Sequence, residues 1–158
     1  VRGLGDAATA LRNIAASESL FASRGDDSGT HKKELSLWRA AGFDPARAKP
    51  RWYRETGSGM GATLNTASAM NAYALADRAT WVAFANKGEL EILAEGDARL
   101  RNPYGVILVD PARHPHVKSA DGQTFIDWLV SPAGQAAIAA FRVNGEQLFF
   151  PTAGSGGS

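Results

Sequence analysis

The sequence contains no cysteine, no long apolar run and almost no net charge. The absence of cysteine excludes disulfide frameworks, thiol nucleophiles and cysteine-based metal sites. Lys and Arg total 17 against 16 Asp and Glu, so the net charge of +1 provides no basic field that would favour nucleic acid. No apolar run reaches the ~18 residues that a membrane-spanning helix needs. The remaining composition, 44% hydrophobic and 21% charged residues, is that of an ordinary globular chain that can form a core.

The length and the two ends of the chain indicate part of a larger protein. The 158 residues are enough for one domain, or for one domain and part of another. The chain begins at Val1 without Met, so we expect any export signal to lie outside these residues. Residues 153–158 read AGSGGS, which is typical of a flexible linker or tag scar. We therefore expect an excised or engineered piece.

Short apolar runs alternate with helical patterns along the chain, which predicts an α/β fold built from strand–loop–helix units. Strands are predicted at residues 20–23, 51–55, 73–76, 90–93 and 104–109. Helices are predicted at residues 6–17, 30–41, 62–71 and 77–84, then around Trp128 and from Pro132 onward. Gly42 is well placed to end the second helix. The tryptophans lie on apolar stripes and are expected in the core: Trp38, Trp52, Trp81 and Trp128.

Two of these units carry a glycine-rich loop between the strand and the helix. The first loop spans residues 24–30 and the second spans residues 57–61. A helix N-terminus has unpaired N–H groups and about half a positive charge, and glycine lets a ligand approach the backbone closely. Arg24 adds a planar guanidinium group whose N–H donors can bind two oxygens at once. Further hydroxyl donors are Ser23, Ser28 and Thr30. Together the loops predict a site for an anion.

Other interpretations of these loops stay open from the residues alone. In one, Asp26, Asp27 or Ser28 merely caps the helix while Arg24 forms a surface ion pair. In another, the second loop is a G-x-G-x-x-A variant of the dinucleotide fingerprint, with Asp77 downstream, in a nucleotide-binding α/β enzyme fragment. However, the sequence shows no G-x-S-x-G elbow and no nucleophile–base set, so we expect a binding protein and no enzyme.

The histidines give no clear metal site. His31 follows Thr30 in the first helical turn, where it either lines the anion site or faces solvent. His114 and His116 flank Pro115 without a nearby carboxylate. Two such ligands are too few for a stable metal site, so we expect neither a bound metal cation nor a cofactor.

The segments around both loops are long and specific. Residues 23–35 read SRGDDSGTHKKEL, and residues 52–64 read WYRETGSGMGATL. Two later segments are NPYGV at 102–106 and FIDWLVSP at 125–132. Together these segments closely resemble the tungstate-binding (TupA) family of ABC-transporter receptors. The resemblance covers nearly the whole chain before the linker-like end.

The resemblance implies a three-layer αβα lobe of a type II periplasmic binding protein, which closes with another lobe over an oxyanion. It implies that Arg24 and Thr30 contact the anion. It extends the ligand-binding set to Ser23, Ser28, Gly29, Gly57, Ser58, Gly59 and Met60. Tungstate is expected first and molybdate next, since residue types cannot separate ions of nearly equal size and charge. Related phosphate receptors carry a similar Arg-x-Asp-x-Ser-Gly-Thr pattern, so a phosphate or sulfate receptor is the alternative.

The resemblance also divides the chain. Residues 1–102 correspond to the second, ligand-binding lobe, and residues 103–152 to a return strand and helices toward the first lobe, which is missing. We therefore expect the isolated chain to offer half a cleft, with a homodimer as one way to close it. The implied partners are the oxyanion and a membrane permease, and the implied location is periplasmic or extracytoplasmic, lipid-anchored or free.

The two acidic residues of the first loop pose a question about ligand choice. A carboxylate facing the ligand would accept a proton from hydrogen phosphate and would repel a fully ionised tungstate. Turned away as helix caps, Asp26 and Asp27 would leave a site made only of donors, which favours the dianion. The sequence leaves their orientation open.

Overall fold

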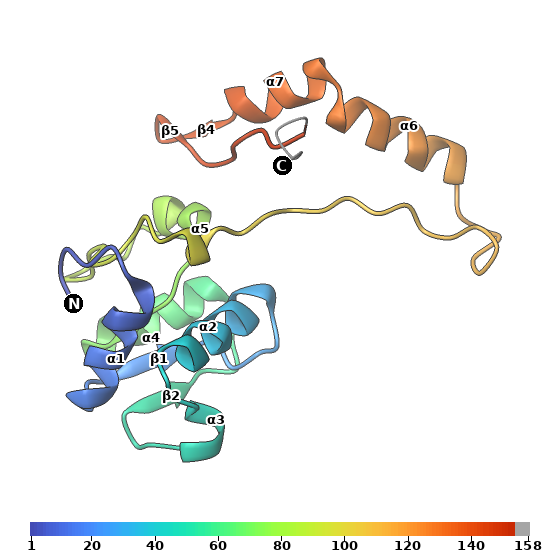
Figure 1. The fold of residues 1–158 in the computed structure, drawn as a ribbon. Helices are drawn as coiled ribbons and strands as arrows, with labels where there is room; N and C mark the ends of the chain where they lie inside the picture. The colour runs from blue at the N-terminus through green and yellow to red at the C-terminus, as the bar shows by residue number, and fades with distance from the viewer. Residues whose placement is uncertain (154–158) are drawn as a thin grey trace. The chain divides into compact units, whose positions relative to one another are not determined.

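The computed structural model describes residues 1–153, and the chain forms two compact units. The first unit runs from Val1 to Asn102, and the second starts at Pro103. In Figure 1 the first unit is coloured from blue to yellow and the second from yellow to red. Within the described residues, no helix has the length and apolar character needed to cross a bilayer. Most of the predicted linker at 153–158 lies outside the described residues.

The first unit is built on a small parallel sheet with the strand order β2-β1-β3. Its strands are β1 (Phe21–Ser23), β2 (Tyr53–Glu55) and β3 (Tyr73–Ala74). Phe21 lies opposite Tyr53 on one side and opposite Tyr73 on the other. Because the strands are parallel, the loops that follow β1 and β2 leave the sheet at the same edge.

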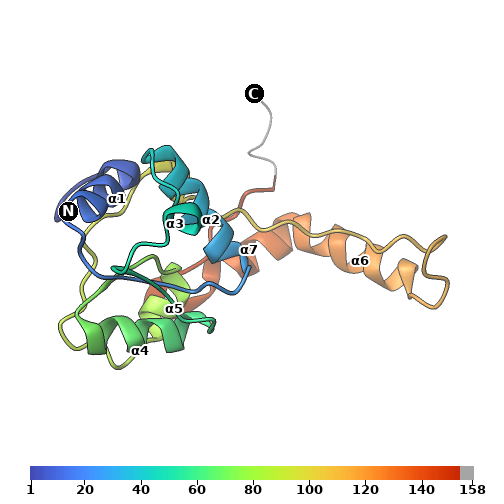
Figure 2. The ribbon, with the colours of Figure 1, turned by 90° about the horizontal axis from the view of Figure 1, so that it is seen from below.

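Helices cover both faces of this sheet, which confirms the three-layer αβα prediction. Figure 2 shows α1 (Ala7–Ala16) and α2 (Gly29–Ala40) on one side of the strands and α4 (Met60–Met70) on the other. Successive strand side chains point to opposite faces. Phe21 therefore packs with α1 and α2, and Ala22 packs with α4.

Aromatic residues dominate the core between the sheet and α2. Trp38 is completely buried, with its ring centroid 5.2 Å from that of Phe21 and 5.7 Å from that of Trp52. Phe21 also stacks on Tyr53 at 5.8 Å. The prediction that Trp38 and Trp52 belong to the core is therefore confirmed. Close packing of several rings makes this cluster the main source of hydrophobic stabilisation in the unit.

Capping residues set the helix limits largely as predicted. Asp6 caps α1 by accepting the Thr9 N–H at 2.5 Å, and Asp77 caps α5 (Arg78–Ala83) by accepting the Thr80 N–H at 2.8 Å. Gly42 follows the end of α2 with φ +80°, a conformation that glycine adopts without strain. α4 begins at Met60, two residues earlier than predicted. Two short helices were not predicted: α3 (Pro45–Ala48) and the 3-10 helix η1 (Ala98–Leu100).

Two predicted strands are wrong. Residues 90–93 and 104–109 have no strand structure. The only pairing near the first segment is an isolated bridge between Leu4 and Ala94 among the residues described. In the second segment Ile107 is 87% exposed and no neighbouring backbone pairs with it within residues 1–153. An apolar run becomes a strand only where a partner backbone can accept its hydrogen bonds.

The second unit has few buried side chains. It contains α6 (Ser119–Val130), α7 (Pro132–Ala140), and a hairpin of β4 (Arg142–Val143) and β5 (Glu146–Gln147). No residue of α6 is buried, and Trp128 is 47% exposed. The prediction of a core position for Trp128 is therefore wrong in this chain. The helical stripe is present, but nothing within the described residues covers it.

Candidate oxyanion site

The two glycine-rich loops lie against each other at the carboxyl edge of the sheet. The Ser58 N–H donates to the Arg24 carbonyl oxygen at 3.2 Å, and the Thr56 N–H donates to the Ser23 carbonyl oxygen at 2.9 Å. A Cβ atom at Gly25 would lie 2.7 Å from the Cβ of Glu55, so a side chain there would push the loops apart. The sequence predicted two such loops, and the structure brings them together.

Each loop ends at a helix N-terminus. Ser28 caps α2, with its Oγ accepting the His31 N–H at 3.3 Å. Gly59 is the N-cap of α4, where no side chain bonds the first N–H groups. Glycine at this position leaves those donors open to an incoming anion. The two helices therefore direct their positive ends toward one edge of the sheet.

Arg24 and Asp26 form an ion pair inside the first loop. Oδ2 of Asp26 accepts from Nε of Arg24 at 3.1 Å and from Nη2 at 2.6 Å, while Oδ1 accepts the Ser28 N–H at 3.3 Å. Hydrogen bonds from Ser28 and then Arg24 lower the pKa of Asp26 to about 2, so its carboxylate is ionised at neutral pH. Among the described residues, Nη1 of Arg24 has no hydrogen bond. One end of the guanidinium thus stays available as a donor.

These contacts answer the question about the acidic residues. Both oxygens of Asp26 accept hydrogen bonds from its own loop, and Asp27 has an 85% exposed side chain that pairs with Lys32. The capping interpretation is correct for Ser28, and the ion-pair interpretation is correct for Arg24. Neither contact uses up the donors of the loops. Capping and anion binding are therefore compatible here.

The predicted ligand residues differ in accessibility. Arg24, Ser28, Thr30 and Ser58 are partly exposed, and the three loop glycines are exposed: Gly29, Gly57 and Gly59. Ser23 is completely buried, and Met60 is 5% exposed. A ligand in the loops can therefore reach these two residues only through their backbone. His31, expected either at the site or in solvent, is instead buried, and its Nδ1 accepts the Asp27 N–H at 3.1 Å.

Two threonines that hold the loops together were not predicted. Thr63, on α4, is completely buried, and its Oγ1 lies 2.8 Å from Oγ1 of Thr56 and 3.1 Å from the Gly59 carbonyl oxygen. The Thr56 hydroxyl in turn donates to the Arg24 carbonyl oxygen at 3.4 Å. Their positions on either side of the second loop were the only signal in the sequence, and no spacing rule links such a pair.

We expect Thr63→Val to lower the free energy of unfolding by about 1–3 kcal/mol, because it removes both hydrogen bonds of the buried Thr63 hydroxyl, one with the Thr56 hydroxyl and one with the Gly59 carbonyl oxygen. Urea denaturation followed by circular dichroism measures the change. Thr66→Val is the matched control, since Thr66 bonds the Ala62 carbonyl oxygen at 3.1 Å on the exposed side of the same helix. Equal losses in both variants would show that Thr63 has no special role.

Comparison with known proteins places the chain in a family. Residues 1–133 match the sequence family described as PBP superfamily domain. The chain belongs to this superfamily. It is 39% identical over 150 residues to the tungstate-binding protein TupA of Peptoclostridium acidaminophilum, covering 94% of this chain and 51% of that protein.

Solved structures agree with this placement in the PBP superfamily. The tungstate binding protein TupA from Desulfovibrio alaskensis G20 is 40% identical, with a TM-score of 0.78 over 97% of this chain and 62% of that chain. The structure of the tungstate ABC transporter from Geobacter sulfurreducens is 45% identical, with a TM-score of 0.75 over 85% of this chain and 56% of that one. The chain spans about half the length of the curated relatives it matches.

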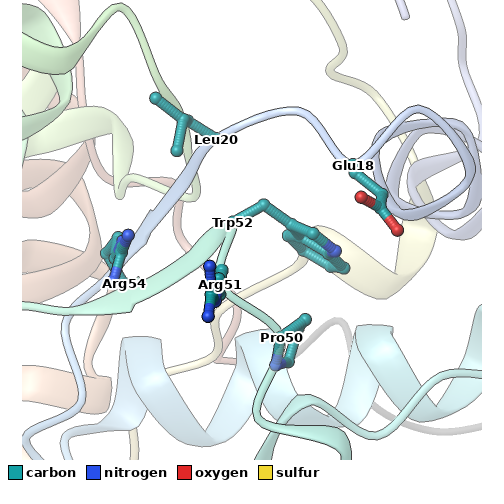
Figure 3. Close-up of a pocket in the computed structure, with 6 residues that line it drawn as sticks. All are labelled: Glu18, Leu20, Pro50, Arg51, Trp52 and Arg54. Carbon is teal, nitrogen blue, oxygen red and sulfur yellow. The ribbon is translucent and has the colours of Figure 1, made fainter.

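This PBP-superfamily chain also has a surface hollow away from the loops. The hollow, of about 500 Å³, lies where β1 and β2 begin (Figure 3). It is lined by Glu18, Leu20, Pro50, Arg51, Trp52 and Arg54. It is wide open, and neither glycine-rich loop reaches it. We place the candidate site at the loops, because helix N-termini and Arg24 converge there.

Proposed function

We propose that this chain binds a tetrahedral oxyanion, tungstate first and molybdate next, as part of the solute receptor of an ABC transporter. The observation that carries the proposal is the hydrogen bond from the Ser58 N–H to the Arg24 carbonyl oxygen. It joins two loops that each end at a helix N-terminus, so their donors face one ligand. The similarity to proteins named tungstate-binding protein supports the choice of ligand.

In the proposed site, Arg24 and Thr30 contact the oxyanion through the free guanidinium end and the hydroxyl group. Ser28 and the N–H groups of three exposed glycines complete the shell: Gly29, Gly57 and Gly59. The Ser58 hydroxyl, which donates to the Thr56 carbonyl oxygen at 3.0 Å, would turn to the ligand on binding. Ser23 and Met60 contribute through their backbone only, because their side chains are buried. Binding is reversible capture without bond making, so the proposal needs neither a catalytic residue nor a cofactor.

The proposed site favours a fully ionised anion. Asp26 lies between Arg24 and Ser28 in the first loop, and hydrogen bonds from these two residues already occupy both its oxygens. Hydrogen phosphate has a proton to donate and therefore needs a free acceptor. A site made of donors offers none, so tungstate or molybdate fits better than phosphate.

The second unit is proposed to complete a two-lobed receptor. Residues 103–152 would return toward the first lobe, while residues 1–102 would form the second lobe. Exposed apolar side chains support this assignment, since Phe125 is 56% exposed and Tyr104 is 76% exposed. Such patches usually mark an interface. Without the first lobe, the same exposed surface would promote a homodimer. In the complete receptor, the proposed partner is a membrane permease. The proposed location is extracytoplasmic.

An NMR titration of the ¹⁵N-labelled chain tests the proposal. We expect tungstate and molybdate to shift the amide signals of Thr30 and of residues 57–60, with weak affinity because one lobe alone would offer half of a cleft. Larger shifts with phosphate or sulfate would favour the alternative receptor class, and a response to NAD alone would favour a nucleotide-binding enzyme. Tight binding of tungstate by the monomer would contradict the half-cleft hypothesis.

A further inference from the structure

A buried carboxyl group lies beneath the two loops. Glu34, on the second turn of α2, is 1% exposed, and its Oε1 accepts from the Tyr53 hydroxyl at 2.6 Å and from Nε1 of Trp38 at 3.2 Å. Tyr53 begins β2, which leads into the second loop. Ser23, which ends β1 and leads into the first loop, lies close enough to the same carboxyl group to lower its pKa. Glu34 therefore connects the helix and both strands that present the loops.

Among residues 1–153, Glu34 forms no ion pair. The groups that act on it are Tyr53 from β2, Ser23 from β1, and Trp38 and His31 from its own helix. His31 accepts the Asp27 N–H at Nδ1, so its neutral ring carries its proton on Nε2. Burial raises the pKa of Glu34, and the hydrogen bonds from Tyr53 and Trp38, together with the nearby Ser23 hydroxyl, offset this only in part. Ionisation of Glu34 in this buried position is energetically unfavourable, and a dianion bound at the loops would add electrostatic repulsion.

The protonated carboxyl group also fits its surroundings. Oε1 can continue to accept from Tyr53 and Trp38 while the other oxygen carries a proton. The Oγ of Ser23 is buried and has no hydrogen-bond partner within residues 1–153, so it can accept that proton's hydrogen bond. Neutral Glu34 thus preserves the connection between α2 and both strands without the buried charge.

We propose that Glu34 is a positioning residue for the oxyanion site, which anchors the two loops and takes up a proton from solvent when the dianion binds. This inference rests on the proposed function. The direction of the pH dependence follows from linkage. Because the anion favours neutral Glu34, the affinity for tungstate is highest at pH values below the titration of this carboxyl group and falls as the pH rises through it. A purely structural anchor would give no such dependence.

Glu34→Gln tests the proton uptake, because glutamine keeps both an acceptor for Tyr53 and Trp38 and a donor for Ser23. The ratio of the tungstate dissociation constants of the variant and of the unchanged chain is measured by NMR from below to above the titration of the Glu34 carboxyl group. We expect a ratio near one at the low end and about fivefold tighter binding by the variant at the high end, a typical coupling between sites. Titration of tungstate itself affects both proteins and cancels. Glu89→Gln, an exposed carboxylate elsewhere, is the control.

A second measurement needs no variant. The ¹³C signal of the Glu34 carboxyl carbon is followed against pH in the unchanged chain, with and without saturating tungstate. We expect tungstate to move the midpoint to higher pH. An unmoved midpoint, or a variant ratio that does not change with pH, would overturn the role of Glu34 while leaving the proposed function intact. Failure of the unchanged chain to respond to tungstate at all would instead overturn the proposed function and this inference with it.

Discussion

Arg24→Gln is expected to weaken tungstate binding by about 10- to 100-fold, because one charge-assisted hydrogen bond contributes about 1.5–3 kcal/mol. A second effect acts in the same direction. Asp26 is now neutralised by the guanidinium at 2.6 Å, and the variant leaves its carboxylate unpaired beside the anion. Because the pKa of Asp26 is held low by Ser28 as well as by Arg24, the carboxylate remains charged and repels the ligand.

The NMR titration described above measures this change. Arg39→Gln serves as the control, since Arg39 is an exposed cation in the last turn of α2, away from the loops. The double variant Arg24→Gln with Asp26→Asn separates the two effects: removing the unpaired carboxylate is expected to recover part of the affinity but not all of it. If Arg24→Gln binds tungstate as tightly as Arg39→Gln does, the guanidinium is no part of the site.

Trp38→Ala is expected to lower the free energy of unfolding by about 3–5 kcal/mol, a large share of the stability of an ordinary domain. The ring is completely buried, and the centroids of Phe21, Phe43 and Trp52 lie within 5.7 Å of it. Its loss leaves a cavity and also removes a donor from Glu34. The first unit is expected to be partly unfolded at room temperature.

Urea denaturation followed by circular dichroism measures the loss in Trp38→Ala. Trp128→Ala is the control for size and chemistry, since Trp128 is 47% exposed on α6. Its expected cost is below about 1 kcal/mol, as for most surface substitutions. Similar losses in both variants would show that the aromatic cluster around Trp38 is not the main core of the chain.

Local signals in the sequence predicted most of the first unit. Asp6 and Asp77 marked helix starts because a capping side chain acts within three residues, and Gly42 marked a helix end because of its positive φ. The strand predicted at residues 104–109 failed because pairing depends on a backbone that local patterns cannot supply. Strand formation there required information from outside the segment.

The same distinction between local signals and tertiary contacts applies to the candidate site. The two loops and Arg24 could be predicted, since glycine and a helix start are local features. The contacts that fix them could not: Thr63 reaches Thr56 across a loop, and Glu34 reaches Tyr53 on another element. Such partners are chosen by tertiary packing. Similarly, the buried position of Ser23 depends on which face of β1 meets α2.

The close contact between Gly25 and Glu55 restricts how this protein can move. With Ser58 bonded to Arg24 as well, neither loop can shift without displacing the other. The pair therefore behaves as one stiff wall, whose shape is established during folding and before any ligand arrives. In the proposed receptor, capture would then rely on rotation of a whole lobe about hinges outside residues 23–63. Amides of the wall that do not contact the ligand should exchange at nearly the same rate with and without tungstate.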